Sequence, residues 1–166
     1  MPTGGSASAP ARDAVARASA ARHALLEFGG VGRLPRGPAS AATVAGAALV
    51  ALARPSRVEH AALVAAAIVG GALATDGQWS AEEPDPQRIV IDEVAGVWTA
   101  LLGIPITPGR CVAAAVVFRV LDKLKPGPIG FVDRLGGKWS IMGDDLLAGA
   151  IANLVLRAWI AVGRLP

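Results

Sequence analysis

The sequence predicts an all-α, membrane-associated helical bundle, on the basis of its composition and the spacing of its apolar runs. Hydrophobic residues make up 53% of the 166 residues and charged residues only 17%, whereas an ordinary soluble domain carries about 25% charged residues. The mean hydropathy is +0.49, and glycine-, proline- or charge-rich segments separate the apolar runs. We therefore expect about three to four membrane-embedded or tightly packed apolar helices and one re-entrant hairpin.

The N-terminal region is expected to begin as a disordered tail and to continue as an amphipathic helix. Residues 1–15 contain no continuous apolar stretch of the kind that a secretory signal needs. From Asp13 to Leu26 the chain is rich in alanine and arginine at helical spacing, which predicts a helix that could lie against a membrane surface. Residues 16–166 are assigned to a single helical domain.

The apolar runs that follow predict the remaining helices. In order, these runs are Ala39 to Ala53, Ala61 to Ala74, Ile89 to Ile106, Arg110 to Leu121 and Leu146 to Val162. The first, second and last could cross a membrane if tilted or extended. Residues 94–118 can double back at the turn from Pro105 to Pro108, with arms of about eleven residues or roughly 16 Å each. Such arms are too short for a bilayer core of about 30 Å, so this hairpin should be re-entrant or packed within the protein.

Three polar segments interrupt these runs and must share one side of the membrane if they form one site. They are Gly29 to Pro38, Asp76 to Glu93 and Arg119 to Asp145. Their lysine and arginine content predicts that they face the cytoplasm.

The composition argues against a nucleic-acid partner. The formal net charge is +3 and the chain contains no tyrosine. Its arginines are scattered rather than interleaved with stacking aromatic residues. The single cysteine, Cys111, lies in an apolar run, so neither an intramolecular disulfide nor a cysteine-based metal site is expected.

The stretch from Phe118 to Gly149 holds most of the residues able to do chemistry. Its acids are Asp122, Asp133, Asp144 and Asp145, and its bases are Arg119, Lys123, Lys125, Arg134 and Lys138. This mixture can bind a hard divalent cation and a phosphate together. The alternative is structural: Asp122 and Lys125 would form a surface pair, Asp133 would lie in a turn, and Asp144 would cap a helix.

A second acidic segment supports the site interpretation. Ile89 to Gly96 and Ile141 to Gly149 each place an acidic pair at the start of an apolar helix, with small residues one turn later. Neighbours on a helix point about 100° apart, so we expect one member of each pair to act as a ligand. Gly96, Ala148 and Gly149 would let the two helices approach closely. The alternative is two independent helix caps at the membrane surface.

The remaining candidates for chemistry are few. His23 and His60 are isolated from the acidic segments, and no nucleophile motif surrounds the hydroxyls of Ser40, Thr43 or Ser140. Lys125 to Pro128 is expected to hold an extended backbone that ends the preceding helix and aims the side chains before it.

In these motifs the chain resembles the phosphatidylglycerophosphatase A family from about Glu27 to Val162. That family reads approximately as an FGxGxxP loop, an IVIDExxG segment, an FRxxDxxKPxPI segment followed by a DR pair, and a GIMxDDxxAG segment. The corresponding segments here are Phe28 to Pro35, Ile89 to Gly96, Phe118 to Ile129, Asp133 with Arg134, and Ile141 to Gly149. The order of the motifs is the same.

The resemblance implies a magnesium-dependent, all-helical membrane enzyme that removes the terminal phosphate of phosphatidylglycerophosphate during phospholipid biosynthesis. It further implies a location in the bacterial inner membrane with the active site facing the cytoplasm. Two departures could alter activity or substrate preference. The turn after the first motif has Ala39 and Ala42 where the family usually has glycines, and Ser140 replaces the glycine before Ile-Met.

The resulting hypothesis assigns a role to each candidate residue. Mg²⁺ would bind Asp92 or Glu93 together with Asp122, Asp133 and either Asp144 or Asp145. The phosphate would bind Arg119, Lys125 and Arg134, with Ser40 and Thr43. Asp122, Asp133 and Asp145 are the expected catalytic residues.

The simplest mechanism is attack of a metal-activated water on phosphorus, with a covalent aspartyl phosphate as the alternative. Two other functions stay open from the sequence: a non-enzymatic cation-binding membrane protein, and a soluble helical phosphatase acting on a small phosphate ester.

Overall fold

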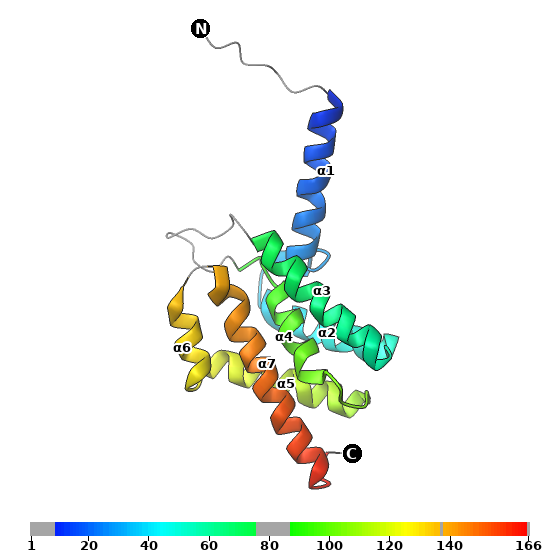
Figure 1. Ribbon diagram of the computed structural model, residues 1–166, viewed down its shortest axis with the longest axis vertical. Helices are drawn as coiled ribbons and strands as arrows, with labels where there is room; N and C mark the ends of the chain where they lie inside the picture. The colour runs from blue at the N-terminus through cyan, green and yellow to red at the C-terminus, as the bar shows by residue number, and fades with distance from the viewer. Residues whose placement is uncertain (1–8, 76–86, 137, 166) are drawn as a thin grey trace.

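The computed structural model describes residues 9–75, 87–136 and 138–165, except for the side chains of residues 9–12 and 138–141. This part of the chain is all-α, as predicted, with seven α-helices, one short 3-10 helix and no strand (Figure 1). The helices are α1 (Ala9–Leu26), α2 (Pro38–Ala53), α3 (Arg57–Thr75), α4 (Ile91–Leu101), α5 (Pro108–Leu124), α6 (Pro128–Leu135) and α7 (Lys138–Ala161). The 3-10 helix η1 (Val31–Arg33) lies in the loop before α2.

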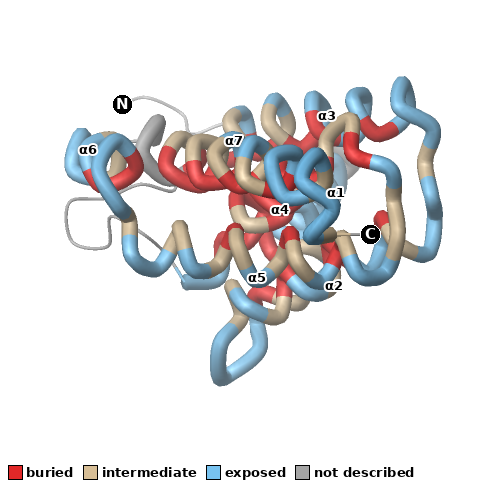
Figure 2. The backbone as a smooth tube through the Cα atoms, turned by 90° about the horizontal axis from the view of Figure 1, so that it is seen from below, coloured by how far each residue is buried: buried red, intermediate tan, exposed pale blue. Residues whose placement is uncertain are grey.

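Helix α4 is the centre of the bundle. It packs against α2, α3, α5 and α7, and Figure 2 shows it as a buried segment with the other helices around it. Val94, Ala95, Val97 and Ala100 are fully buried. Helix α4, the first arm of the short hairpin at Pro105, is thus packed within the protein.

Close approach of α4 and α7 depends on two glycines. A Cβ atom added to Gly149 would lie 2.3 Å from the Gly96 carbonyl oxygen, and one added to Gly96 would lie 2.9 Å from the Asp145 carbonyl oxygen. Ala148, the neighbour of Gly149 in the sequence, is fully buried. The predicted contact between these small residues is therefore confirmed, and it sets the distance between the two acidic segments.

Replacing Gly149 with alanine should destabilise the protein strongly. The added methyl group meets backbone of α4, which a side-chain rotation cannot relieve, and overpacking of this kind costs about 3 kcal/mol. We expect the thermal unfolding midpoint to fall by about 6 to 12 °C. Gly109→Ala is the matched control, because nothing lies within 4 Å of its added Cβ. Equal midpoints for the two variants would contradict the close contact.

Two of the described helices are apolar enough to be compared with membrane spans. Within the described residues, α3 is the one helix long and apolar enough to cross a membrane, and α2 is a shorter apolar helix. One such helix is weak evidence for a span, because the core helix of a soluble protein passes the same test. The last apolar run, predicted as a third possible crossing, is not among the candidate spans.

The N-terminal helix begins earlier than expected. Helix α1 starts at Ala9 rather than Asp13, so residues 9–15 of the expected tail are helical, and residues 1–8 lie outside the described part. Alanine favours helix, and Pro10 falls in the first turn, where proline is tolerated. Helix α1 projects from the body (Figure 1). Its end is held by Arg22, whose Nε donates to the Ala74 carbonyl at 2.6 Å.

The segment after α5 differs most from the prediction. Instead of an extended backbone, Lys125 adopts left-handed dihedral angles (φ 43°, ψ 52°) as the C-cap of α5, and Gly127 also has a positive φ. Pro128 then starts α6, which the sequence did not predict. Proline fits the first position of a helix because its missing N–H has no partner there in any case.

The acidic pair of the last motif also lies at an unexpected place. Helix α7 begins at Lys138, so Asp144 and Asp145 lie inside the helix rather than at its start. Met142 is buried in the core, so the apolar face of α7 extends N-terminally past the acidic pair. The other pair, Asp92 and Glu93, does occupy the first turn of its helix, α4.

Candidate metal and phosphate site

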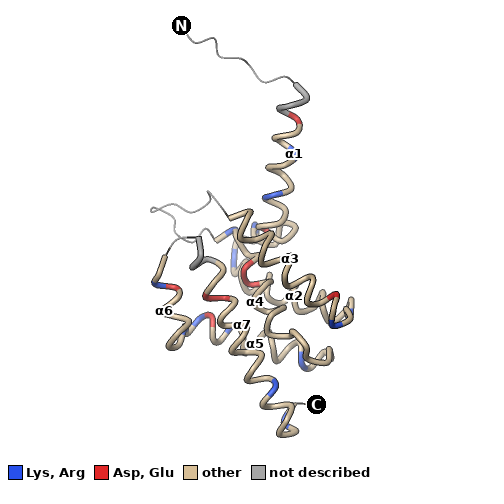
Figure 3. Tube along the Cα trace, in the orientation of Figure 1, with Lys and Arg blue, Asp and Glu red and all other residues tan. Residues whose placement is uncertain are grey.

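Three helices bring the predicted acidic residues together. Asp92 and Glu93 come from the start of α4, Asp122 from the end of α5, and Asp144 with Asp145 from α7. In Figure 3 acidic residues lie close to one another where these helices meet. The glycine contact between α4 and α7 places the Asp145 turn directly against α4.

The carboxylates form two groups that share one residue. Asp92, Glu93 and Asp145 each offer an oxygen within 4.8 Å of the others, and so do Asp122, Asp144 and Asp145. Both members of each acidic pair therefore lie in a group that could hold a metal ion, whereas the sequence predicted one ligand per pair. Each group is formed between helices rather than on the face of one helix. Neighbouring side chains that point in different directions from one helix can therefore both approach carboxylates of another helix.

Most of these carboxylates are buried, and two of their oxygens lack a hydrogen-bond partner. Asp92, Asp144 and Asp145 are 5%, 7% and 5% exposed. Among the described residues, Glu93 Oε2 and Asp145 Oδ1 are buried without a hydrogen-bond partner. An unpaired buried charge is costly, and a bound cation removes that cost. Carboxylate oxygens are the ligands that hard divalent cations prefer, so the donor set fits such an ion.

The same burial perturbs the acidity of the group. Burial raises the pKa of Glu93 and of Asp144 above the ordinary values. Burial also raises the pKa of Asp145 well above its ordinary value, and the nearby charges of Glu93 and Asp122 add to the effect. These carboxyl groups therefore favour either a proton or a cation.

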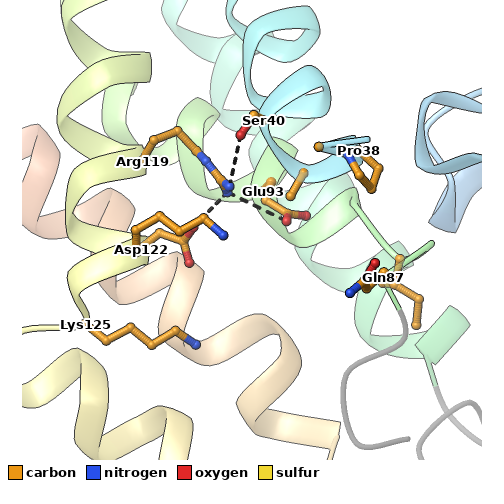
Figure 4. A pocket seen from close by; sticks show the side chains of 11 residues that line it. Pro38, Ser40, Gln87, Glu93, Arg119, Asp122 and Lys125 are labelled. Atoms are coloured by element: carbon orange, nitrogen blue, oxygen red, sulfur yellow. Dashed lines mark hydrogen bonds and ion pairs between the residues drawn. The ribbon is translucent and has the colours of Figure 1, made fainter. Parts of the chain in front are cut away.

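Arg119 links the acidic groups to the pocket beside them. Its Nη1 lies 2.7 Å from Asp122 Oδ2 and 3.8 Å from Glu93 Oε1. Its Nη2 donates to Ser40 Oγ at 3.3 Å. Figure 4 shows the guanidinium group among these three side chains. The predicted phosphate ligands Arg119 and Ser40 are thus neighbours, although they are far apart in sequence.

Lys125 binds two further carboxylates. Its Nζ donates to Asp133 and, at 2.7 Å, to Asp144 Oδ2. Burial acts to lower the pKa of Lys125, but the hydrogen bonds to Asp133 and Asp144 outweigh it and raise that pKa. Lys125 is therefore a permanent cation in the site. Its left-handed backbone carries a strain that a long side chain would ordinarily avoid.

A pocket of about 470 Å³ opens over these cations. It is lined by Gly37, Pro38, Ala39, Ser40, Gln87, Ile89, Glu93, Arg119, Asp122, Lys123 and Lys125. Helix α2 begins at this pocket with Pro38 in its first turn, and no side chain caps the helix. The first amide groups of a helix lack partners within it and attract anions. One face of the pocket is therefore suited to a phosphate.

The sequence interpretation missed part of this pocket. Gly37, Pro38 and Gln87 were not among the predicted site residues, and Lys123 was named only in the general cluster. The Gly37-Pro38 pair was an available signal, since proline is common at the first position of a helix.

Three predicted ligands lie elsewhere. Thr43 is fully buried and donates to the Ala39 carbonyl at 3.0 Å rather than lining the pocket. Asp133 contacts Lys125 and belongs to neither acidic group. Arg134 is exposed on α6 and is not among the pocket residues. The side chain of Ser140 and the whole of Gly137 lie outside the described residues.

Comparison with known proteins points to one family. Residues 24–160 match the family model described as Phosphatidylglycerophosphatase A. Phosphatidylglycerophosphatase A of Escherichia coli is 43% identical over 74 residues, 43% of each chain. The protein of the same name from Haemophilus influenzae is 41% identical over 76 residues, which cover 45% of this chain and 47% of that protein.

A third relative carries a different name. The Bacteroides thetaiotaomicron protein named "Putative phosphatidylinositol-3-phosphatase" is 35% identical over 107 residues, 63% of this chain and 65% of that protein. The chain thus covers less than two thirds of each of these three relatives. No solved structure matches it.

Proposed function

Since the chain belongs to the phosphatidylglycerophosphatase A family, we propose that it is a Mg²⁺-dependent lipid phosphatase. It would hydrolyse phosphatidylglycerophosphate to phosphatidylglycerol and phosphate. The observation that carries this proposal is the juxtaposition of buried, unpartnered carboxylate oxygens with a pocket lined by Arg119, Lys123 and Lys125. Such a site combines a place for a cation with a place for a phosphate.

The two acidic groups would hold the metal. They comprise Asp92, Glu93, Asp122, Asp144 and Asp145. When bound there, Mg²⁺ supplies Lewis acidity to a phosphoryl oxygen and makes water a better nucleophile. Asp133 would act indirectly in this arrangement, by positioning Lys125.

The pocket cations would hold the phosphate. Hydrogen bonds to Asp122 and Ser40 engage only part of the Arg119 guanidinium group, which has several further N–H donors. Lys123, Lys125 and the first turn of α2 line the same pocket. Together they would neutralise charge on the phosphoryl oxygens as the ester bond breaks.

Hydrolysis then requires that a proton move from the attacking water to the leaving oxygen. A water oxygen forms the new bond to phosphorus, and the bond from phosphorus to the lipid's glycerol oxygen breaks. Asp122 and Glu93 are the carboxylates that line the pocket. We assign Asp122 as the group that accepts the proton from water and returns it to the leaving oxygen, because Arg119 holds its carboxylate in place at 2.7 Å.

Membrane association follows from the substrate and from the apolar surface. Val112, Val116, Val120 and Leu124 form a stripe of exposed side chains along α5, and this stripe ends beside Lys125 of the pocket. Acyl chains could lie along it while the headgroup enters the pocket. We place the protein at the bacterial inner membrane with the pocket facing the cytoplasm. Recovery of the protein in the soluble fraction without detergent would instead favour a soluble phosphatase.

A second candidate substrate is phosphatidylinositol 3-phosphate, because the longest of the three similar stretches belongs to the relative named for that activity. Phosphate release from the two lipids in matched mixed micelles distinguishes the candidates. We expect kcat/KM for phosphatidylglycerophosphate to be at least about tenfold higher, a difference of about 1.4 kcal/mol. A reversed ratio would reassign the substrate.

The metal-free protein should become less stable as the pH rises. The raised pKa values of Glu93, Asp144 and Asp145 mean that the folded state binds more protons than the unfolded state above pH 4 or so. Arg119 and Lys125, the cations facing them, compensate only part of this charge. The contribution of these three groups to stability is therefore largest at low pH and is lost as the pH rises through the raised pKa values. Burial lowers the pKa of His60, so the contribution of that group changes in the opposite direction.

Thermal unfolding of chelator-treated protein tests this expectation. The unfolding midpoint should be about 5 °C or more lower at pH 7.5 than at pH 5.5. Addition of Mg²⁺ should raise the midpoint at pH 7.5 and have little effect at pH 5.5, where protons compete for the carboxylates. A midpoint that rises with pH in the absence of metal would contradict the uncompensated burial of these groups.

A further inference from the structure

We propose that the site binds two divalent cations that share Asp145 as a common ligand. This inference rests on the proposed function for its catalytic role, whereas the binding itself can be measured without substrate. It is carried by the two overlapping carboxylate groups and by an orphaned oxygen on the residue common to both.

Asp145 is the structural link between the two groups. Asp92 and Glu93 meet it from α4, and Asp122 and Asp144 meet it from α5 and α7. Asp145 is 5% exposed, and its Oδ1 has no hydrogen-bond partner among the described residues. A carboxylate has two oxygens, so one residue can serve two neighbouring ions.

The carboxylates around Asp145 are held in place by their own contacts. Asp122 is fixed by Arg119 at 2.7 Å, and Asp144 is fixed by Lys125 at 2.7 Å. In the group on α4, the backbone N–H of Glu93 donates to Asp92 Oδ1 at 3.1 Å, and Glu93 Oε2 is unpartnered among the described residues. Arg119 also lies 3.8 Å from Glu93 Oε1, so this guanidinium group lies beside both carboxylate groups.

The charge of the site favours two ions over one. The two groups contain five carboxylates, and Asp133 is a sixth, because it shares Lys125 with Asp144. Arg119, Lys123 and Lys125 are the cations beside them. Fully ionised, this set carries a net charge of about −3. One divalent cation leaves about −1, which repels a phosphate monoester, itself near −2 at neutral pH. Two divalent cations leave about +1, which attracts it.

Metal titration of the full chain tests the proposal. Chelator-treated protein is titrated with Mn²⁺ alone, and again with saturating inorganic phosphate, while bound Mn²⁺ is counted by electron paramagnetic resonance. We expect two Mn²⁺ per chain and a spectrum showing magnetic coupling between them. Asp13→Asn, at an exposed position on α1, should also bind two.

Single variants separate the two halves. Asp92→Asn and Asp122→Asn should each retain one Mn²⁺, because each variant damages only one group, whereas Asp145→Asn should lose both. The unfolding midpoint of each metal-free variant is measured to establish that it is folded. One Mn²⁺ per wild-type chain in both conditions would overturn the proposal, and so would retention of one or two ions by folded Asp145→Asn.

The same experiment separates this inference from the proposed function. Phosphate release by a chain that binds one ion overturns the two-ion site and leaves the phosphatase assignment intact. Two bound ions in a chain that releases no phosphate from either lipid support the site and overturn the phosphatase assignment.

Discussion

The Asp145→Asn variant should release phosphate from phosphatidylglycerophosphate at least about a thousandfold more slowly than the wild type, a loss of about 4 kcal/mol in transition-state stabilisation. Asp145 belongs to both acidic groups, so its loss removes a ligand from each. The same change should stabilise the metal-free protein by about 2 kcal/mol, because a neutral amide replaces a buried, uncompensated carboxylate. Steady-state phosphate release and thermal unfolding together measure the two opposite effects.

The matched control for this variant is Asp13→Asn. It makes the same chemical change on α1, where Asp13 is exposed, and should leave both activity and stability near the wild-type values. If Asp145→Asn were destabilised and inactive, loss of folding would explain the result. An active Asp145→Asn variant would exclude Asp145 from the metal site.

Replacement of Arg119 by alanine should have the second largest effect, lowering kcat/KM by about 10² to 10³. Arg119 is the cation held between Asp122, Glu93 and Ser40 at the pocket. Its loss would remove a cation from the pocket and the ion pairs with Asp122 and Glu93. Arg119→Lys should recover part of the activity, since lysine keeps the charge but cannot present the planar set of N–H donors.

Inhibition by inorganic phosphate provides the second readout for Arg119. The phosphate concentration for half-inhibition should rise by about tenfold or more in Arg119→Ala, as expected if the residue binds the phosphoryl group directly. Arg17→Ala, on the exposed part of α1, is the control and should leave this concentration unchanged. An Arg119→Ala variant with unaltered phosphate inhibition would restrict Arg119 to a structural role.

The sequence predicted that the residues of the two acidic groups lie close together, and the structure places them so. The paired acids at Asp92 and Asp144, with small residues one turn later, predicted that two distant helices meet. The structure confirms that meeting at Gly96 and Gly149. Such a contact is predictable because only small residues permit backbones to approach so closely.

Other features depended on where helices begin, which local sequence specifies poorly. The pair at Asp144 looked like the start of a helix, but the apolar face of α7 continues past it through Met142. The sequence did not predict helix α6, because the segment Lys125-Pro126-Gly127-Pro128 was interpreted only as the end of a helix. In the structure the same segment ends α5 and starts α6. That reversal places Asp133 beside Lys125, outside the two acidic groups.

Of the two hydroxyl residues predicted to bind phosphate, Ser40 and Thr43, one lies at the pocket. Ser40 lies at the pocket and accepts a hydrogen bond from Arg119. Thr43, three residues later, turns into the core and bonds to its own helix. Helical spacing alone does not decide between these outcomes, because it depends on how α2 is rotated against α4. That rotation is fixed by tertiary contacts such as the hydrogen bond from Trp98 Nε1 to the Gly46 carbonyl at 2.9 Å.

A non-enzymatic cation-binding protein would need the acidic groups but not the pocket. In this structure the two are joined, since Glu93 and Asp122 belong both to acidic groups and to the pocket lining. This overlap favours chemistry on a phosphate over simple storage or transport of a cation.

The most direct test of a metal-dependent lipid phosphatase is phosphate release from phosphatidylglycerophosphate with and without Mg²⁺, for the wild type, Asp122→Asn and Asp145→Asn. We expect release by the wild type only when Mg²⁺ is present, and a loss of at least about a hundredfold in each variant. Equal release with and without Mg²⁺, or full activity in both variants, would contradict the assignment of the acidic groups as the catalytic metal site.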